Sequence, residues 1–377
     1  MAEEFQFTPE QQDLRRAVRR FCAERVGEQM VRRLMETDTG HDPALWARLG
    51  GELGVLGLAV PEELGGAGGG LVDQAVVAEE LGAALVPGPL FGTVGLAVPA
   101  LVALGSDELH PGLLTELVDG SRTAGFAVPD RGGRFDRDRV TVTAADGALS
   151  GELAQVVDGG ADVLLVAARI GDGTGLYVTE GGDRTPLSTL DRTRRQARVR
   201  FDATPARLLA TGADAEAAIT AALRTGAALL AAEQVGGAQR LLDLTVAHAG
   251  TRLQFGRPIG SFQAVKHRCA DMLVLVEHAR SAAYHAAWAL QGGTDDPDLA
   301  VSVAQATCSE AYQQVAQAAI QLHGGIGFTW EHPAHLYYKR AVTDAALLGS
   351  AAEHRERIAQ LVLDQAAPTG GLTVAGG

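Results

Sequence analysis

The stretch RLQFGRPIGSFQ, residues 252–263, gathers chemically capable side chains at a break between two Ala/Leu-rich stretches that are typical of helices. Arg252 offers a planar fork of N–H donors that suits phosphate oxygens, and Phe255 can lie against a flat ring system. Gly256 lets another group approach the backbone closely. Because Arg-x-x-Phe is not a specific signal on its own, a phosphate-ligand site and a plain helix–helix turn with solvated arginines both remain open.

A second stretch, QLHGGIGFTWEH at 321–332, adds to the first. Gln321 and His323 precede the pair Gly324–Gly325. Paired glycines after a helix can form a simple C-cap, or they can expose the backbone to a nucleotide ligand. Two such turns that join long helices of one bundle are much less expected by chance, so together they favour a ligand site.

Positioning these turns requires long helices, and the pattern changes twice along the chain. Residues 1–118 and 214–365 have helical periodicity, whereas 119–213 contain short β-rich segments separated by Asp, Gly and Pro. With 377 residues, the chain is too long for one ordinary core. We therefore expect a mainly α protein with an N-terminal helical domain, a central antiparallel β domain and a C-terminal helical bundle, followed by a flexible Gly-rich tail at 366–377.

Individual elements can be expected within these regions. Thr8-Pro9-Glu10-Gln11 predicts a capped helix start. The bundle is expected to contain helices over 214–249, 261–291 and 296–322, followed by two more. The segments expected to be strands are TAGFAVP, RVTVTA, VLLVAAR, GLYVTE and RRQARVRFDA.

Charge and composition exclude several classes of protein. The net charge of −14 argues against general nucleic-acid binding, which needs a basic surface. The three cysteines, which are far apart, suggest neither disulfides nor a metal site. The acidic start is unlike a secretory signal, and no apolar run is judged long enough to span a membrane. These features predict a cytoplasmic protein.

The α–β–α order and three motifs resemble the acyl-CoA dehydrogenase family over nearly the whole chain. The motifs are GLAVPEELGG (57–66), RLQFGRPIGSFQAVKHRCADM (252–272) and QLHGGIGF (321–328). The resemblance implies an FAD cofactor and an acyl-CoA or related thioester substrate. In this family a carboxylate removes the α-proton next to the thioester carbonyl while flavin N5 takes the β-hydride.

The resemblance also assigns roles to residues. Arg252 would contact the FAD pyrophosphate, Phe255 would pack on the cofactor, and the Gln-x-x-Gly-Gly segment would hold the adenosine end. Family members place these residues on the FAD of a neighbouring subunit. The cofactor-binding residues implied in this way are Arg252, Phe255, Ile259, Gln263, Gln321, Gly324, Gly325 and Ser350.

The catalytic base of the family is missing. Gly349–Ser350 match the family pattern, but the residue at the preceding base position is Leu348. At the second family location for a base, an ungapped count from Phe255 reaches Gly226. Neither residue can take a proton.

Two other carboxylates are weak substitutes for the base. Asp344 lies one helical turn from Leu348, although a solvated or ion-paired role is simpler. Glu233 lies in an otherwise apolar helix, where burial would raise its pKa, or where it satisfies a neighbour across the bundle. Glu353 follows Ser350 at the spacing of a capping box, which favours a structural role.

The segments that would face the flavin ring depart from the family as well. GFAVPDRGGRFDRDRV at 125–140 keeps Pro129 but lacks the usual hydroxyl side chains. In 151–169, Ala, Gln and Val stand where the family brings an aromatic residue and a Ser or Thr. The flavin-ring half of the site is therefore lost, while the adenine and pyrophosphate half is kept.

Three hypotheses follow from this division. The chain resembles the base-lacking subunit of heteromeric acyl-CoA dehydrogenases, which completes the FAD site of a second acyl-CoA dehydrogenase-like subunit. Alternatively, it is a homo-oligomeric flavoenzyme with a displaced base, acting on an unusual CoA- or carrier-bound acyl chain. A third possibility is a non-catalytic structural or regulatory relic that binds no flavin.

Overall fold

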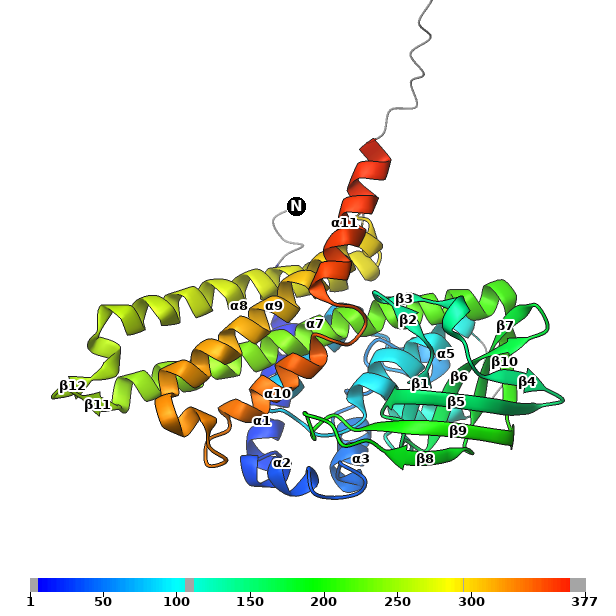
Figure 1. Ribbon diagram of the computed structural model, residues 1–377, viewed down its shortest axis with the longest axis horizontal. Coiled ribbons are helices and arrows are strands. Elements are labelled where there is room, and N and C mark those ends of the chain that lie inside the picture. Colours follow the sequence, from blue (N-terminus) through cyan, green and yellow to red (C-terminus); the bar gives the residue numbers. More distant parts are fainter. Residues whose placement is uncertain (1–5, 106–111, 294, 367–377) are drawn as a thin grey trace, which may run out of the picture.

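The computed structural model describes residues 6–105, 112–293 and 295–366, which form three regions in the expected order (Figure 1). Short helices at the N-terminus lie against the middle of a long helical bundle, and a twisted sheet lies against one end of it. The N-terminal elements are α1 (Pro9–Arg25), α2 (Glu28–Leu34), α3 (Pro43–Gly51), η1 (Glu62–Leu64), α4 (Leu71–Ala83), η2 (Phe91–Ala97), α5 (Val98–Leu104) and α6 (Leu113–Val118). Thr8 and Gln11 form the predicted capping box at the start of α1.

The β domain is a mixed sheet, so the prediction of a purely antiparallel domain was wrong in part. The main strands are β1 (Ala124–Ala127), β4 (Thr143–Ala145), β5 (Ala148–Val157), β6 (Val163–Ile170), β7 (Gly173–Thr179), β8 (Asp183–Pro186), β9 (Gln196–Pro205) and β10 (Arg207–Thr211). Most neighbours pair antiparallel, but β6 pairs parallel with both β1 and β4. The long connection from β1 to β6 permits a parallel pairing, which a hairpin cannot make. Of the predicted strand RVTVTA, only 143–144 belong to β4.

A small hairpin stands apart from this sheet. It consists of β2 (Asp130–Arg131) and β3 (Arg134–Phe135), which pair antiparallel. The short helix η4 (Arg137–Arg139) follows it. This hairpin falls within the segment that the family resemblance places at the flavin ring.

The bundle is built on three long antiparallel helices, α7 (Gly212–Thr251), α8 (Gln263–Leu290) and α9 (Pro297–His323). The short helix η6 (Gly324–Phe328), then α10 (Ala334–Asp344) and α11 (Ala351–Ala366), complete it. Glycines in α7 allow close helix packing: a Cβ atom on Gly236 would lie 1.8 Å from the carbonyl oxygen of Glu79 in α4. The predicted flexible tail lies, from 367 onward, outside the described residues.

The expectation about membrane-spanning runs needs a correction. Among the described residues, α7 is one helix that is long and apolar enough to cross a membrane by length and composition. Its most apolar window is 67% buried inside the protein. This burial is typical of a core helix, and α4, α8 and α9 all pack against it.

Candidate functional site

The turn after α7 is a tight β-hairpin rather than a loose loop. Strands β11 (Leu253–Gln254) and β12 (Arg257–Pro258) pair across the two residues Phe255 and Gly256. Both have positive φ, +53° and +75°, as a two-residue type I′ turn requires. A phenylalanine rarely adopts this conformation. The Phe255 ring lies edge-on to that of Phe262, with centroids 6.0 Å apart, and 90% of the residue is exposed.

The cationic side chains of this turn have no acidic partner in the part of the chain that the structure describes. Neither Arg252 nor Arg257 forms an ion pair with any described residue, and Arg257 lies over the Phe262 ring, 4.1 Å from its centroid. Arg252 caps the end of α7, and its carbonyl oxygen accepts a hydrogen bond from the Ile259 backbone N–H at 2.8 Å. The geometry therefore presents guanidinium groups that an external anion can occupy.

The end of α9 exposes backbone in the same way. Gly324 has φ of +64°, and a Cβ atom added to Gly324 or Gly325 would meet nothing within 4 Å. Gln321 is exposed on the last turn of α9. Gly327, in contrast, is packed closely, because its added Cβ would lie 2.8 Å from the carbonyl oxygen of Ile320. Gly324 and Gly325 therefore leave the backbone accessible, while the tight packing of Gly327 holds the segment in place.

A stack of histidines joins the two turns. The His323 ring lies between His248 of α7 and His332, with ring centroids 4.5 and 4.2 Å apart. Burial, followed by the charges of His323 and Arg252, lowers the pKa of His248. Burial is also the main reason that the pKa of His332 falls to about 4. The stacked rings hold the last turns of α7 and α9 beside each other.

The remaining residues assigned to the cofactor lie in different settings. Ile259 is half-buried in the short helix η5 (Ile259–Ser261), and Gln263 is exposed at the start of α8. Ser350 caps α11: its backbone N–H donates to Glu353 Oε2 at 2.8 Å, and its hydroxyl accepts from the Glu353 N–H. The hydroxyl of Ser350 is thus already used in a capping box.

The family base position is closed by the chain itself. Leu348 is 6% exposed and belongs to the main hydrophobic core. The β2–β3 hairpin lies directly against it, since a Cβ atom on Gly133 would lie 2.7 Å from the Leu348 carbonyl oxygen. Gly349 is equally close to Gly132, at 2.6 Å between the added Cβ and Cα. No space for a ligand separates these two backbones.

The second base position is closed by η2. A Cβ atom on Gly226 would lie 2.5 Å from Leu96 Cδ2 and 3.1 Å from the carbonyl oxygen of Gly95. A carboxylate side chain therefore does not fit at this position unless η2 moves. Both positions at which the resemblance places a base, Leu348 and Gly226, are filled by packing within the chain.

The two substitute carboxylates lie in a buried ion cluster that sequence reasoning did not identify. Arg194, in the β8–β9 connection, donates to Glu233 Oε1 at 2.5 Å and to Asp344 Oδ1 at 3.1 Å. Arg340 of α10 pairs with Glu233 and, at 2.6 Å, with Asp191. The cluster ties the β domain to α7 and α10. The sequence feature that indicates such a cluster is Glu233 itself, because a carboxylate buried in an apolar helix needs a cation as a partner.

The cluster contains more acids than bases. Burial would raise the pKa of Glu233, but the guanidiniums of Arg194 and Arg340 hold it below its usual value. Burial raises the pKa of Asp344 to about 7, against the opposing effect of Arg194. Asp344 is therefore the carboxyl group of this cluster that can carry a proton near neutrality. Asp344 is 0% exposed, so no substrate atom reaches it in this conformation.

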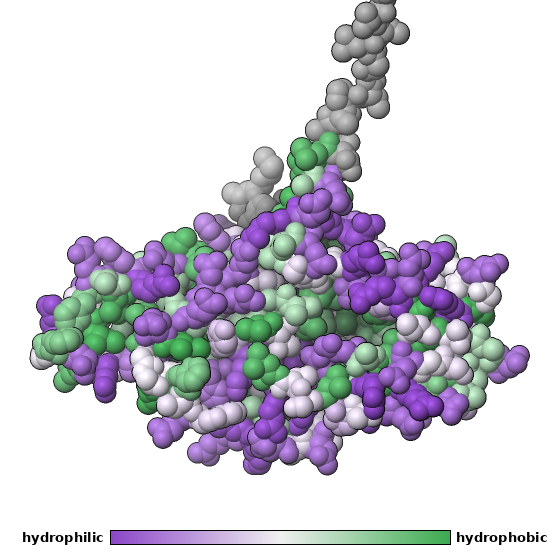
Figure 2. Space-filling model, in the orientation of Figure 1, coloured by the Kyte–Doolittle hydropathy of each residue, from purple (hydrophilic) through white to green (hydrophobic). Residues whose placement is uncertain are grey.

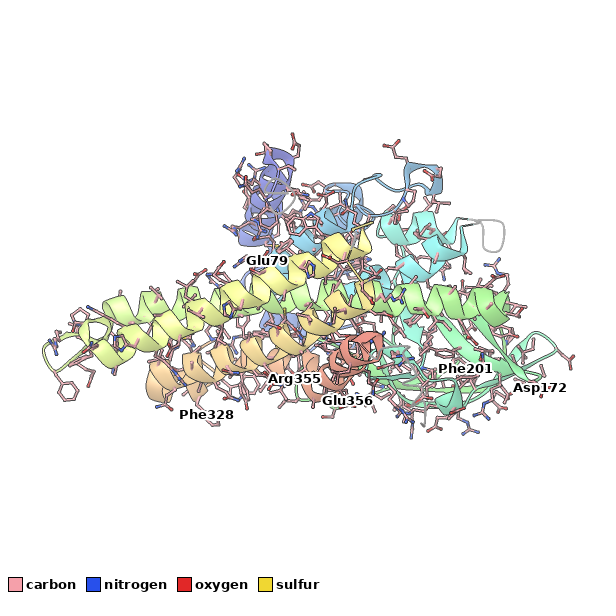
Figure 3. All side chains as sticks on the ribbon, turned by 90° about the horizontal axis from the view of Figure 1, so that it is seen from above. Glu79, Asp172, Phe201, Phe328, Arg355 and Glu356 are labelled. Atoms are coloured by element: carbon pink, nitrogen blue, oxygen red, sulfur yellow. The ribbon has the colours of Figure 1, made fainter. Side chains whose placement is uncertain are left out.

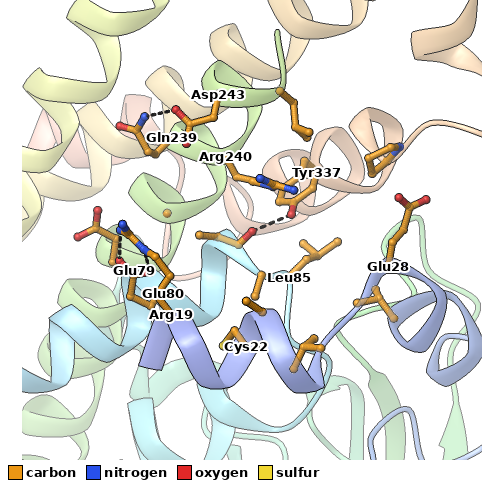
Figure 4. Close-up of a pocket in the computed structure, with 18 of the residues that line it drawn as sticks. Arg19, Cys22, Glu28, Glu79, Glu80, Leu85, Gln239, Arg240, Asp243 and Tyr337 are labelled. Carbon is orange, nitrogen blue, oxygen red and sulfur yellow. Dashed lines mark hydrogen bonds and ion pairs between the residues drawn. The ribbon is translucent and has the colours of Figure 1, made fainter. Parts of the chain in front are cut away.

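A large cavity lies elsewhere, between the N-terminal helices and the bundle (Figure 4). Its volume is about 570 Å³, and α1, α4, α7 and α10 line it. Its polar groups largely engage one another: Arg19 pairs with Glu80, and Tyr337 donates to the carbonyl oxygen of Ala83 at 2.7 Å. Its walls include none of the residues that the resemblance assigns to FAD.

The end of the bundle that carries both turns exposes large apolar side chains. Figure 2 shows apolar residues gathered over the α7–α8 end, and Figure 3 places Phe328 near the end of α9, away from the sheet. Phe328 is 82% exposed and Trp330 is 60% exposed. Together, the exposed apolar residues Leu253, Phe255, Leu273, Val274, Ile326, Phe328 and Trp330 define what we call the apolar end.

Comparison with known proteins identifies the class. Residues 8–121 match the acyl-CoA dehydrogenase N-terminal domain and 216–363 match the acyl-CoA dehydrogenase C-terminal domain. The chain belongs to the acyl-CoA dehydrogenase family. Members of this family bind FAD, so FAD is the cofactor that the family implies.

Individual relatives are similar over nearly their full length. The acyl-CoA dehydrogenase IpdE2 of Mycobacterium tuberculosis (strain ATCC 25618 / H37Rv) is 42% identical over 349 residues, covering 93% of this chain and 96% of that protein. Among solved structures, a variant of the Tcur3481–Tcur3483 steroid ACAD has a TM-score of 0.82 and 32% identity, covering 95% of this chain and 99% of that chain. The ChsE4–ChsE5 complex from Mycobacterium tuberculosis has a TM-score of 0.83 and 30% identity, covering 97% and 100%.

Proposed function

We propose that this chain is the base-lacking subunit of a heteromeric, FAD-dependent acyl-CoA dehydrogenase. In this proposal it contributes the adenine and pyrophosphate contacts to an FAD shared with a second acyl-CoA dehydrogenase-like subunit. The partner supplies the carboxylate that removes the α-proton and the contacts to the flavin ring. The acyl-CoA or related thioester then reacts on the partner's side.

One observation carries the proposal: the two halves of the family site differ in accessibility. Leu348 and Gly226 are both sealed by packing against Gly133 and Leu96. Phe255, Gly324 and Gly325, in contrast, face open space. A chain that bound and oxidised its own substrate would need the first half open. A chain that serves a neighbour's cofactor needs only the second.

The residues of the open half fit the diphosphate and adenosine portions of FAD. Arg252 has no anionic partner among the described residues, so it can form a charge-assisted contact to a phosphate oxygen without losing an ion pair. The backbone of Gly324–Gly325 is bare enough for close approach. FAD, when bound, supplies the hydride acceptor. In this proposal, the role of this chain is to bind the cofactor and to fix its position relative to the partner.

The partner is inferred from surface chemistry together with the relatives. Exposed aromatic and aliphatic side chains that gather at one end of a molecule, as in the apolar end, are typical of an interface. Leu253 and Phe255 of this group lie in the turn that carries Arg252. The ChsE4–ChsE5 structure, to which this chain is similar, is by its name a complex of two components. These two observations favour a partner of the same family that covers the apolar end and brings FAD to it.

The test is co-purification of the chain with flavin. A tagged copy would be expressed alone and, separately, together with its neighbouring open reading frames. We expect a colourless protein in the first case and a yellow complex in the second. One FAD per chain in the protein expressed alone would favour the homo-oligomeric alternative. A complex that forms but contains no flavin would favour the structural or regulatory relic.

A displaced base is less well supported. It requires Asp344 or Glu233 to face a substrate, and both are buried beside arginines. Freeing Asp344 would break its buried ion pair with Arg194, and freeing Glu233 would break its buried pairs with both Arg194 and Arg340. Breaking a buried ion pair is strongly unfavourable. The chain would also have to open the contact between Leu348 and the β2–β3 hairpin.

A further inference from the structure

A second cavity, of about 410 Å³, lies where the N-terminal domain meets the bundle. Loop residues 56–71 form one wall, and η2, α5 and α7 form the others. Its volume falls within the range of about 300–1,000 Å³ that is typical of small-molecule sites. We name it the α5–α7 cavity. It shares no lining residue with the turns assigned to FAD, so it does not depend on the proposed function.

The walls of this cavity are fixed by glycines. A Cβ atom on Gly66 would lie 2.2 Å from the carbonyl oxygen of Val60, and one on Gly70 would lie 2.2 Å from Gln291 Oε1. The Gln291 side chain in turn accepts a hydrogen bond from the Val72 N–H at 3.0 Å. The Gly-rich run at 65–70 therefore lets the loop lie tightly against its neighbours, so the cavity is preformed.

The lining is apolar and carries no free charge. Val60, Val98, Val102 and Leu229 are among the apolar side chains that line it. Among the described lining residues Arg224 alone is charged, and its Nε donates to Asp298 Oδ1 at 2.7 Å. A CoA thioester, with its several phosphates, finds no unpaired cation here. The cavity suits a neutral molecule that is mostly hydrocarbon.

Two polar side chains in the cavity have unused hydrogen-bonding capacity. Gln74 is only 3% exposed; its amide nitrogen donates to the Val55 carbonyl oxygen at 2.9 Å, while its Oε1 accepts from no described residue. Thr225 lines the same cavity from α7, where it is half-buried, and its hydroxyl bonds to no residue that the structure describes. A buried acceptor is normally paired, so the open Gln74 Oε1, in a cavity that also offers the Thr225 hydroxyl, points to a ligand that carries one hydroxyl group.

From these features we propose that the α5–α7 cavity binds a neutral, compact hydrocarbon alcohol. Its ring system lies against the valines and Leu229, and its hydroxyl donates to Gln74 Oε1 and accepts from Thr225. The lining residues come from the 56–71 loop, η2, α5 and α7, so we infer a compact ligand that contacts these segments at once. The site is separate from the family base positions, because the cavity is lined by Thr225 and not by the sealed Gly226.

The experiment uses the full chain and two alcohols of equal carbon number, 1-adamantanol and 1-decanol. Binding would be measured by saturation-transfer NMR and titration calorimetry. We expect the compact alcohol to bind more tightly than the linear one. Val102→Phe, which fills the cavity, should weaken binding by at least about tenfold. Val362→Phe, the same change at a residue that is 48% exposed on α11, should leave binding unchanged.

A second variant tests the hydroxyl contact without filling the cavity. Thr225→Val should weaken 1-adamantanol binding by about two- to tenfold, the effect of losing one neutral hydrogen bond. This measurement keeps the proposal testable if Val102→Phe fails to fold. Absence of 1-adamantanol binding to the wild-type chain would overturn the site. Equal binding of 1-decanol would overturn the inferred compact shape, and equal binding by folded Val102→Phe would place the ligand elsewhere.

Discussion

At the scale of single residues, Arg252 is the sharpest test of the cofactor assignment. Arg252→Ala removes a guanidinium that has no acidic partner within the described part of the chain. A charge-assisted contact to phosphate contributes about 1.5–3 kcal/mol, so FAD affinity of the assembled complex should fall about ten- to a hundredfold. Arg200→Ala, at an exposed position on β9, is the matched control. Equal flavin occupancy in both variants would count against the assignment.

Leu348→Glu tests whether the missing base alone explains the loss of chemistry. The new carboxylate would take the place of a core side chain that packs beside Gly133. Burying an unpaired charge should destabilise the fold by roughly 2–5 kcal/mol. We expect a lower apparent Tm and no dehydrogenase activity for the variant on its own. Turnover by the variant alone would show that the contact between residue 348 and the β2–β3 hairpin opens readily.

Asp344 predicts a particular dependence of stability on pH. Burial raises its pKa in the folded state to about 7 from an ordinary 3.8, so folding favours the protonated form. Stability from this group is therefore present at low pH and is lost as the pH rises from about 4 to 7. Asp344→Asn cannot ionise and escapes this loss. The apparent Tm of the variant relative to wild type should be several kelvin higher at pH 8 than at pH 5.

At the scale of elements, short sequence patterns predicted the helix ends, because caps and turns depend on neighbouring residues. Asp296 caps α9 through the backbone N–H of Asp298 at 2.8 Å, as the Asp-Pro start indicated. The placement of Arg252 and Gly324 at the ends of long helices also followed from helix periodicity and glycine. The parallel pairing of β1 with β6 did not, because it depends on segments distant in sequence.

The packing that closes the positions of Leu348 and Gly226 could not be predicted from the sequence either. Leu348 and Gly226 indicated a missing base, but only the fold shows that the β2–β3 hairpin and η2 fill the space. The ion cluster could not be predicted either, because Arg194 and Arg340 lie far from Glu233 in the sequence. Sequence spacing predicted that Arg252 and Gly324 follow the ends of long helices, whereas long-range packing closes the positions of Leu348 and Gly226.

The turn after α9 gives a prediction at this scale. Phe328 is 82% exposed, so Phe328→Asp should not disturb the fold of the isolated chain. If a partner covers the apolar end, a buried aspartate at that interface should weaken association by at least about tenfold. Leu363→Asp, at a residue that is 66% exposed on α11, is the matched control. Sedimentation of each variant with the partner would decide, and equal association of both would remove Phe328 from the interface.

At the scale of the whole molecule, the proposed division of labour predicts that this chain alone does not oxidise acyl-CoA thioesters. Removing an α-proton needs a positioned base, whose loss typically costs about 10²–10⁴-fold in rate. Leu348 and Gly226 supply none, and Asp344 is buried beside Arg194. The assay would use purified chain, saturating FAD, an artificial electron acceptor and several acyl-CoA thioesters, with and without the co-purified partner.

Activity should appear only in the complex. A base-removed variant of the partner should then abolish it, while this chain continues to hold the complex and its flavin together. That pattern separates a cofactor-holding role from a catalytic one, because flavin content and turnover respond to changes in different subunits. Robust turnover by the chain alone would instead require Asp344 or Glu233 to leave the ion cluster. In that case Asp344→Asn and Glu233→Gln, tested singly, would identify which carboxylate moves.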